Sequence, residues 1–570
     1  MLPFIALPSI VLLVATPCVM WCQLGASIKV QSLKLTRIRQ WRTSAPLQCS
    51  SHLCMSTTAD FYDKGFTTGL VDDTIFALSS GPMTKTGVAV IRLSGRQAGE
   101  ALKILQKVPE RMRSQGYKQN SYPKSRLACV RYLFDPLSGD MLDQALVLWM
   151  PGPRSFTGED VVELHTHGSR AVIMGIFSAL EYIDNNRNQF EGFERGGIRA
   201  AERGEFTRRA FDNGRMDLTE VEGLSDLLDA DTNLQRVQAL KQMEGHLSAV
   251  FERWRAALVK FLAHTEAVID FGDDDREEDV DDSSLYMLLP KVEELRIEIE
   301  THLQDGRKGE LVREGLRIAL AGPPNAGKSS LMNALAKRPA AIVSPIAGTT
   351  RDIVEVRMDL AGVSCAVSDT AGLRDSTDDP IELEGIKRAR EAFRRAHLKV
   401  FVGDASDPAS MKQAATMLKS MQDDSSLDEE GVTGTAGEDK VLFVLNKKDL
   451  VVDDSAGSSL TSQGLIDATF VPISCSTGEG LAELEQTLET SIQDLVSSSS
   501  SEGTLITRER HRRHLQRCAA HLDEFLSGTL PMDAAAEELR LASLELGRVT
   551  GRVDVEELLD IIFKDFCIGK

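Results

Sequence analysis

The segment that most constrains this 570-residue chain is GPPNAGKS at residues 322–329, because it fits the phosphate-binding pattern Gly-x-x-x-x-Gly-Lys-Ser/Thr. An apolar strand pattern precedes it at residues 318–320, and a helical pattern begins at Ser330. In that setting the backbone N–H groups of the loop and of the helix N-terminus surround phosphate groups. We predict that Lys328 reaches the β- and γ-phosphates and that the Ser329 hydroxyl ligates magnesium.

Two further loops follow in the order found in nucleotide hydrolases. Residues 348–352, GTTRD, offer a threonine hydroxyl that can complete the magnesium shell and sense the γ-phosphate. Residues 369–372, DTAG, follow an apolar strand, which places the Asp369 carboxylate in the second shell of magnesium. The N–H of Gly372 can meet the γ-phosphate. The order and spacing make the nucleotide prediction specific.

The last two loops predict which base is bound. Residues 446–449, NKKD, end an apolar strand, and Asp449 can accept hydrogen bonds from the ring N–H and the exocyclic amine of guanine. Adenine has no such pair of donors and would leave a buried carboxylate unpaired. Residues 474–476, SCS, follow the next strand and are predicted to contact the guanine carbonyl. The five loops together predict a GTPase over residues 322–476.

The catalytic group that positions water in Ras-like enzymes is absent, because Leu373 stands where those enzymes carry glutamine. The acidic segment at residues 375–384 supplies the nearest polar candidates. No arginine finger can be assigned, so an extra cation or a partner must neutralise the charge that develops on the phosphates.

The rest of the chain predicts a multidomain protein of α/β and all-α parts. A small α/β unit is expected at residues 72–190 and a helical region at 199–313. Strands and helices alternate over residues 316–491, which predicts a parallel sheet with crossover helices, and a second helical region is expected at 503–570. The formal charge of -20 excludes a positive field over the whole protein, and the nine cysteines form no CxxC pair.

Residues 1–60 have the composition of a targeting presequence. No Asp or Glu precedes Asp60, and an apolar run at residues 2–22 comes before a basic, Ser/Thr-containing part. A membrane anchor is the alternative, but three prolines interrupt the apolar run, and we expect no stable membrane association of the mature form. The order of the two parts favours import into a plastid over a mitochondrion.

The sequence resembles one family closely, the tRNA-modification GTPases called MnmE or TrmE. The resemblance covers about residues 72–570. Its markers are GPPNAGKSSLMNAL from Gly322, IAGTTRD from Ile346, DTAGLR from Asp369, SFTGEDVVELHTHG from Ser155, GEFTRRAFDNGRMDL from Gly204 and the terminal FCIGK. The C-terminal Cys-Ile-Gly-Lys is the most specific of them, because GTPases in general lack it.

The resemblance implies a homodimer with a folate-binding N-terminal domain and a GTPase domain inserted in an all-helical domain made from two separated stretches. It also implies a partner, the MnmG-type flavoprotein. The two proteins act on tRNA and install an aminomethyl-type group at carbon 5 of the wobble uridine. A reduced-folate one-carbon unit, such as that of 5-formyltetrahydrofolate, is implicated.

The resemblance also implies metal and catalytic residues. Potassium would supply the missing positive charge, and the catalytic glutamate would be Glu382. We place it by counting back from Gly385, because one more residue lies between Asp369 and Glu382 than in the bacterial pattern. The potassium positions are Asn325, Ser344, Ile346 and Thr349, and the magnesium positions are Ser329 and Thr350. The full set predicted to contact the nucleotide and its ions is Asn325, Ala326, Gly327, Lys328, Ser329, Ser330, Ser344, Thr349, Thr350, Asp369, Thr370, Ala371, Gly372, Asn446, Lys447, Asp449, Ser474 and Cys475.

For the reduced folate, the matching positions are Arg92, Glu163, Arg215 and Lys570. Arg215 stands where lysine is more usual, which keeps the charge and changes the geometry of the hydrogen bonds. Cys567 is a candidate nucleophile toward the one-carbon unit, and its alternative is a packed cysteine at a helix end.

Two other functions compete with tRNA modification. A ribosome-assembly GTPase would bind ribosomal RNA and need no folate, but we find no basic stripe or GxxG-type RNA-binding segment. A GTP-dependent scaffold without catalysis would have a defective switch, whereas Asp369 and Glu382 are both present.

Overall fold

The structure is a computed structural model of the chain. It describes residues 73–81, 85–119, 122–190, 192–193, 196–272, 281–304, 307–337, 355–369, 391–423, 440–451, 469–496, 506–553, 559, 562–563, 566 and 569. The predicted presequence at residues 1–60 lies outside these ranges. Within them, no helix combines the length and the apolar character that crossing a bilayer requires.

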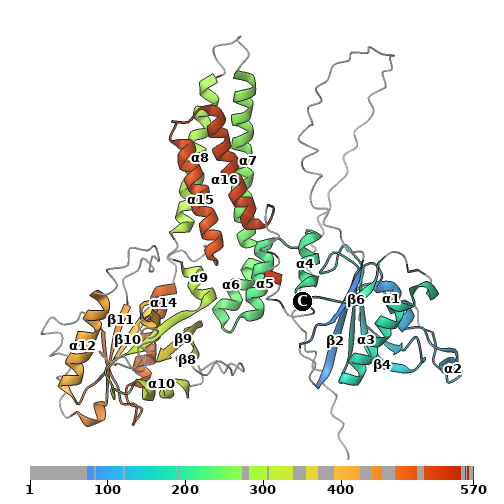
Figure 1. Ribbon diagram of the computed structural model, residues 1–570, viewed down its shortest axis with the longest axis horizontal. Helices are drawn as coiled ribbons and strands as arrows, with labels where there is room; N and C mark the ends of the chain where they lie inside the picture. Colours follow the sequence, from blue (N-terminus) through green and yellow to red (C-terminus); the bar gives the residue numbers. More distant parts are fainter. Residues whose placement is uncertain are drawn as a thin grey trace, which may run out of the picture. The chain divides into compact units, whose positions relative to one another are not determined.

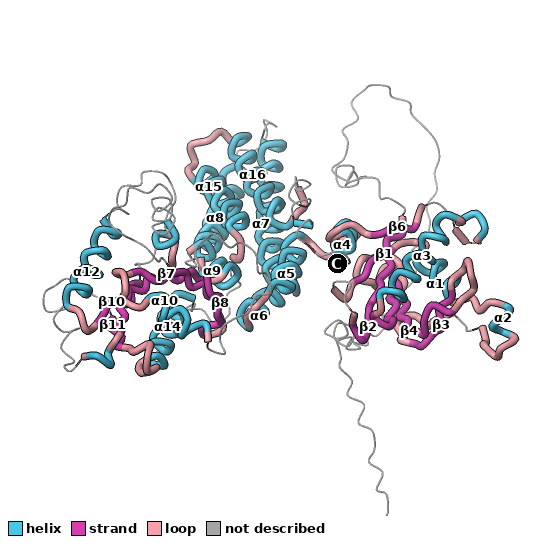
Figure 2. Tube along the Cα trace, turned by 60° about the horizontal axis from the view of Figure 1, so that its bottom comes forward, coloured by secondary structure: helices cyan, strands magenta, loops and turns pink. Residues whose placement is uncertain are grey.

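Six strands form the first sheet, in the order β3-β4-β5-β2-β1-β6. Their bounds are β1 (Thr74–Leu78), β2 (Thr86–Ser94), β3 (Cys129–Phe134), β4 (Met141–Met150), β5 (Val161–Gly168) and β6 (Ile198–Ala200). Neighbours are antiparallel except β1 and β6, which are parallel. Helices α1 (Ala98–Leu105) and α3 (Arg170–Asn185) share one apolar core with the sheet, and α2 (Glu110–Arg113) is short. Figure 2 shows these strands and helices together.

Alternation along the central strands separates a core face from an outer face. In β2, Ile91 and Leu93 are fully buried in the core shared with the helices, and Arg92 lies between them. In β5, Leu164 is fully buried and Glu163 is its neighbour. The register pairs Arg92 with Glu163. The two charged residues therefore meet on the face of the sheet opposite α1 and α3.

The all-helical part combines two stretches of the chain. Its first stretch contains α5 (Leu218–Asp229), α6 (Asn233–Met243), α7 (His246–Gly272) and α8 (Asp281–Leu303). The preceding helix, α4 (Glu205–Asp212), packs Phe206 against Ile75 and Ala77 of the first sheet. The second stretch contains α15 (Glu509–Leu526) and α16 (Met532–Thr550), which lie beside α8 and α7 (Figure 1). Trp254, Val292, Leu515 and Leu546 come from these four long helices and share one core. The two stretches thus form one packed unit.

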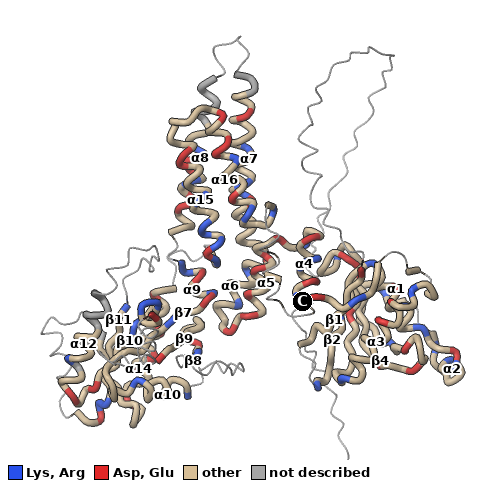
Figure 3. The backbone as a smooth tube through the Cα atoms, in the orientation of Figure 1, with Lys and Arg blue, Asp and Glu red and all other residues tan. Residues whose placement is uncertain are grey.

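Residues of both charge signs occur along the long helices (Figure 3). Ion pairs connect neighbouring helices at their surfaces: Arg253 with Glu298 at 2.6 Å, and Arg540 with Glu266 at 2.7 Å. Such exposed pairs contribute little stability, because water and salt screen them. The apolar core therefore holds the helices together.

The second sheet has six strands in the order β12-β11-β10-β7-β9-β8. Their bounds are β7 (Leu316–Ala321), β8 (Glu355–Leu360), β9 (Val363–Asp369), β10 (Leu398–Asp404), β11 (Lys440–Asn446) and β12 (Thr469–Pro472). All pairs are parallel except β8 with β9. Helices α10 (Lys328–Ala336) and α14 (Leu481–Val496) share one core with the sheet, and α12 (Pro408–Asp423) contributes to the other; α9 (Lys308–Glu314) precedes β7.

This arrangement confirms the predicted fold class, an α/β unit followed by an all-helical part into which a parallel sheet with crossover helices is inserted. It also explains why the predicted loops converge. The parallel strands β7, β9, β10, β11 and β12 all end at the same edge of the sheet. In sheets of this kind, ligands bind at that edge.

Candidate functional sites

The loop after β7 has a backbone that only glycine can adopt at two points. Gly322 has φ +145°, and a Cβ there would lie 2.1 Å from the carbonyl oxygen of Val402. Gly327 has φ +98°, and its Cβ would lie 2.0 Å from Nδ2 of Asn446. Larger residues would push the loop away from β10 and β11. The loop is therefore held close against the ends of the neighbouring strands, with its N–H groups around the start of α10.

Lys328 is the first residue of α10 and is 8% exposed. Its ammonium group donates hydrogen bonds to the carbonyl oxygens of Gly322 and Pro323, each at 2.9 Å. Burial lowers the pKa of Lys328, and the Asp369 carboxylate opposes that shift. The cation therefore lies inside the phosphate loop, held by two of the loop's carbonyl oxygens.

Ser329 and Asp369 are brought together as the magnesium prediction requires. The Ser329 hydroxyl donates to Oδ2 of Asp369 at 2.8 Å. The other carboxylate oxygen, Oδ1, is buried and has no hydrogen-bond partner among the described residues. A buried anionic oxygen without a donor is costly, and a hydrated cation at Ser329 would satisfy it. The pair thus fits a magnesium ion, which Ser329 would ligate directly and Asp369 through water.

Asn446 connects the phosphate loop with the loop after β12. It is 2% exposed; its Nδ2 donates to the carbonyl of Ala326 at 2.9 Å, and its Oδ1 accepts from the N–H of Cys475 at 3.2 Å. The nitrogen and the oxygen of the side-chain amide are therefore both used in holding two other loops. Asn446 is a positioning residue in this geometry.

Asp449 is aimed by two hydroxyl groups. Ser474 donates to its Oδ1 at 2.6 Å and Ser476 to its Oδ2 at 3.1 Å. These hydrogen bonds, the one from Ser474 first, lower the pKa of Asp449 and keep it an acceptor of hydrogen bonds. An ionised acceptor suits the paired N–H donors of guanine.

Lys447 has φ +65°, and its ammonium group lies 2.5 Å from Oδ2 of Asp404. Burial raises the pKa of Asp404, but the hydrogen bonds from Lys447 and Ser406 outweigh it and lower that pKa. Sequence analysis missed Asp404. Its signal was available, since an acidic residue ends the apolar strand β10 at the ligand-binding edge of the sheet.

Most of these residues line one cavity of about 770 Å³; Asp369, Asp404 and Ser474 lie behind its lining and hold Ser329, Lys447 and Asp449. That volume lies in the range of small-molecule and cofactor sites. The lining residues are Gly322, Pro324, Asn325, Gly327, Lys328, Ser329, Ser330, Asn446, Lys447, Asp449, Leu450, Cys475 and Ser476. Phosphate-binding and base-binding loops thus face one space.

Several predicted residues lie outside the described ranges. They are Ser344, Ile346, Thr349, Thr350, Thr370, Ala371, Gly372, Glu382, Cys567 and Lys570. Their roles stay predictions. Of the four potassium positions, only Asn325 is described; it has φ +63° and lines the cavity.

A second polar site occupies the outer face of the first sheet. The Arg92 guanidinium donates to Oε1 of Glu163 from Nε at 3.1 Å and from Nη2 at 3.0 Å. His165 lies 3.3 Å from Oε2 of Glu163. Burial raises the pKa of Glu163, but hydrogen bonds from His165 and Arg92 and the charge of Arg92 outweigh it and lower that pKa. Both side chains of the ion pair are 16% exposed, so the pair stays accessible.

Two aromatic rings flank Arg92, and sequence analysis missed both. The centroids of Phe156 and Phe206 each lie 5.7 Å from Cζ of the guanidinium. Arg215 is exposed, and its Cγ lies 3.3 Å from where a Cβ on Gly158 would sit. Arg215 is thus beside the loop that carries Phe156, and no hydrogen bond from it to Arg92 or Glu163 is found.

The end of the chain approaches the same site. The Ser79 hydroxyl donates to the carbonyl oxygen of Gly569 at 2.9 Å. Ser79 directly follows β1, in which Ala77 is the register partner of Arg92. Gly569 therefore lies about two residues along the sheet from Arg92, and Lys570 follows it.

Comparison with known proteins agrees with this arrangement. The family profile described as the GTP-binding protein TrmE N-terminus matches residues 74–215, and that described as the MnmE helical domain matches residues 218–567. A human mitochondrial protein, named as a subunit of a 5-taurinomethyluridine tRNA synthase, is 44% identical over 500 residues, which are 87% of this chain and 93% of that protein.

Two further relatives carry related names. The tRNA modification GTPase MnmE of Parvibaculum lavamentivorans is 44% identical over 501 residues, 87% of this chain and 100% of the relative. A mitochondrial tRNA modification GTPase of Dictyostelium discoideum is 40% identical over 514 residues, 88% of this chain and 96% of the relative. On the match of both profiles and of relatives over most of its length, the chain belongs to the MnmE (TrmE) family of tRNA-modification GTPases.

Proposed function

We propose that this chain hydrolyses GTP as part of the modification of carbon 5 of the wobble uridine in tRNA, with an aminomethyl-type group as the substituent. The observation that carries the proposal is the single cavity onto which both Lys328 and Asp449 open, in a chain of this family. Lys328 provides charge for phosphates, and Asp449 provides an acceptor pair for guanine. Because the chain belongs to this family, we favour tRNA modification over the alternative function in ribosome assembly.

In this proposal the residues divide into binding and positioning groups. Lys328 and the loop N–H groups bind the phosphates, and Asp449 selects guanine. Asn446 holds the phosphate loop and the loop after β12 in register. A bound magnesium ion would neutralise phosphate charge, with Ser329 and Thr350 as its ligands. Glu382 orients the attacking water, because Leu373 cannot.

Potassium is proposed as the second cation, with Asn325, Ser344, Ile346 and Thr349 as its positions. Among the described residues, no arginine lines the nucleotide cavity. A second cation is therefore needed to neutralise the charge that develops on the phosphates. The test is GTP hydrolysis by the mature chain in potassium and in sodium at equal ionic strength. We expect a severalfold higher rate in potassium, as stabilisation of developing charge predicts. Equal rates would remove the potassium assignment.

The Arg92 site is proposed to bind a reduced folate. A folate carries a glutamate tail that needs cations and a pterin whose adjacent N–H donors suit a carboxylate. Arg92 and Arg215 supply the former and Glu163 the latter. The approach of Gly569 supports a role of Lys570 in the same site. Cys567 stays the candidate nucleophile toward the one-carbon unit. Deletion of residues 567–570 should then stop tRNA modification and leave GTP hydrolysis intact.

The first sheet is also proposed as the surface through which two copies associate. On its outer face, Val130 and Leu146 are register partners and are 54% and 39% exposed. Exposed apolar residues on an uncovered sheet face favour burial against a second copy. Light scattering on the mature chain tests this, and a monomer at micromolar concentration would contradict it.

Domain assignments, partner and location complete the proposal. The folate-binding domain is predicted at residues 72–190, the helical domain at 199–313 and 503–570, and the GTPase domain at 316–491. Because β6 pairs with β1 and Phe206 packs on the same sheet, we extend the folate-binding domain past residue 190 to include β6 and α4. An MnmG-type flavoprotein is the proposed partner, and its retention by the immobilised chain is the test.

Residues 1–60 are proposed to direct import into an organelle, and mitochondrial relatives make the mitochondrion as consistent a destination as the plastid. A fluorescent protein fused to residues 1–60 distinguishes the two, and a cytosolic signal would contradict import.

A further inference from the structure

The loop between β4 and β5, residues 151–160, forms one wall of the Arg92 site. It carries Phe156, whose ring stands 5.7 Å from the guanidinium of Arg92. The ring on the other side, Phe206, is fully buried and belongs to α4. Phe156 is 36% exposed, so it is the ring of the two that a ligand can reach.

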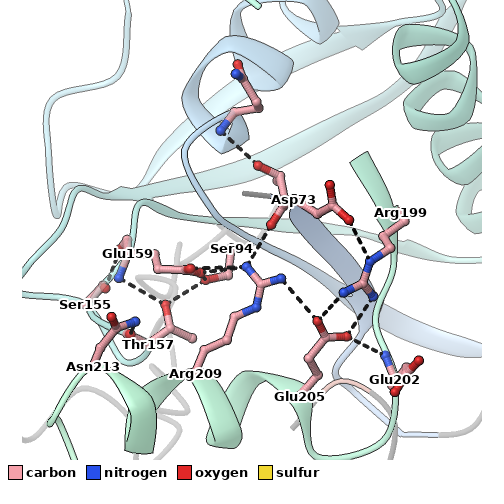
Figure 4. A network of polar contacts seen from close by, with 12 residues as sticks. Asp73, Ser94, Ser155, Thr157, Glu159, Arg199, Glu202, Glu205, Arg209 and Asn213 are labelled. Atoms are coloured by element: carbon pink, nitrogen blue, oxygen red, sulfur yellow. Dashed lines mark hydrogen bonds and ion pairs between the residues drawn. The ribbon is translucent and has the colours of Figure 1, made fainter. Parts of the chain in front are cut away.

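A polar network fastens this loop to β2 and to the residue after α4 (Figure 4). The Ser94 hydroxyl lies 2.6 Å from that of Thr157 and donates to Oε2 of Glu159 at 2.7 Å. Asn213 donates to the carbonyl of Thr157 at 2.7 Å, and the Ser155 hydroxyl donates to the carbonyl of Glu159. The loop's conformation thus depends on side chains from two other parts of the chain, β2 and the residue after α4.

Arg209 lies at the centre of this network (Figure 4). Its Nη1 donates to both carboxylate oxygens of Glu159 at 3.1 Å and to the carbonyl of Asp73 at 2.8 Å. Its Nη2 donates to Glu205 at 3.1 Å. Arg209 is 7% exposed, so water cannot readily replace these partners. Its position on α4, three residues after Phe206, joins both rings that flank Arg92 to one guanidinium.

We propose that Arg209 is a positioning residue of the Arg92 site: through Glu159 it holds the loop at residues 151–160 so that Phe156 offers its face to a planar ring of the ligand. The inference rests on the reduced-folate site proposed above. A stacked ring gains from a fixed aromatic partner, because a mobile one must first be ordered. Loss of Arg209 would leave Glu159 with a partly buried charge and fewer donors, which favours displacement of the loop.

The planar fork of arginine suits this role better than lysine does. Arg209 reaches Glu159 and Glu205 from different nitrogens of one rigid group. A lysine ammonium keeps the charge but cannot reproduce the fixed geometry. Arg209→Lys should therefore restore part of what Arg209→Gln loses.

Calorimetry of the full chain with 5-formyltetrahydrofolate tests the proposal. We expect Arg209→Gln to raise Kd about tenfold, and Arg209→Lys to raise it less, as expected for loss of a buried charged hydrogen bond. Arg203→Gln makes the same chemical change at an exposed residue of the preceding turn and should leave Kd unchanged. GTP hydrolysis should be the same in all three variants. If Arg209→Gln fails to fold, Glu159→Ala removes the same contact from the loop side and should also raise Kd.

A double-mutant cycle separates positioning of Phe156 from a general structural role. In a Phe156→Leu background, Arg209→Gln should raise Kd less than about threefold, because the ring that it positions is already gone. Equal effects of Arg209→Gln in both backgrounds would overturn the proposal. Unchanged affinity of Arg209→Gln alone would overturn it while leaving the folate site in place, whereas no binding by the unsubstituted chain would overturn both.

Discussion

The two sites of this protein are built in different ways. In the nucleotide site, each loop follows directly after a strand of one parallel sheet, so β7, β9, β11 and β12 deliver Lys328, Asp369, Asn446 and Ser474 to one edge. In the Arg92 site, the residues come from segments spread over residues 92–209: Arg92 lies on a strand, Phe156 in a loop, and Arg209 on a helix. The first site follows from topology, and the second depends on packing between distant segments.

This difference predicts how each site responds to substitution. The loops of the nucleotide site contact the ligand directly, so changes there should remove a whole recognition element. The Arg92 site is held by a network of several hydrogen bonds and ion pairs, so loss of one side chain should lower ligand affinity only in part.

The largest effect is expected at Asp449. Asp449→Asn replaces a carboxylate acceptor by an amide that presents N–H donors toward the N–H donors of guanine. We expect the Kd for GTP to rise on the order of a thousandfold, as sites built around such hydrogen bonds predict. Asp494→Asn, at an exposed ion pair on α14, is the matched control. Fluorescence titration with a labelled GTP measures both, and similar affinities for GTP in the two variants would contradict guanine recognition by Asp449.

A smaller effect, on rate alone, is expected at Glu382. Glu382→Ala should lower kcat roughly a hundredfold while GTP binding is retained, the pattern for loss of a group that positions water. Single-turnover hydrolysis with saturating GTP gives the rate directly. Asp379→Ala is the comparison, and if it has this effect in place of Glu382→Ala, the alignment across the extra residue is wrong.

The graded response is tested at Glu163. Glu163→Ala should raise the Kd for 5-formyltetrahydrofolate about tenfold or more, because the carboxylate hydrogen bonds to the pterin are lost. Affinity for GTP should be unchanged. Glu181→Ala, an exposed carboxylate on α3, serves as control for calorimetry. An unchanged folate affinity in Glu163→Ala would refute this use of the Arg92 site.

The contrast also explains what the sequence could reveal. Strand-loop patterns around Gly327 and Asp449 are local, so both the parallel sheet and the nucleotide residues could be predicted from them. That the two helical stretches form one domain is implied by the family resemblance. Which helices pack together, α15 with α8 and α16 with α7, could not be predicted, because helical periodicity does not contain that information. Asp404 has a local signal, at the end of β10, that was overlooked.

The aromatic and arginine groups around Arg92 left no local signal of their role. Phe156 lies in a loop whose course is set by contacts with Ser94 and Asn213, each more than 50 residues away in sequence. In the sequence, Arg209 is one basic residue on a short amphipathic helix. Only the packing of α4 against the sheet shows that it contacts Glu159. Contacts of this kind arise when distant segments pack together, and hydrophobic periodicity does not predict them.

Both sites are proposed to serve one reaction on tRNA. Mass spectrometry of wobble nucleosides in organellar tRNA tests it, in cells that contain only the Asp449→Asn or the Glu163→Ala protein, with Asp494→Asn as control. We predict that the uridine substituted at carbon 5 disappears with Asp449→Asn, falls strongly with Glu163→Ala and is retained in the control. Full modification with either site variant would contradict the account.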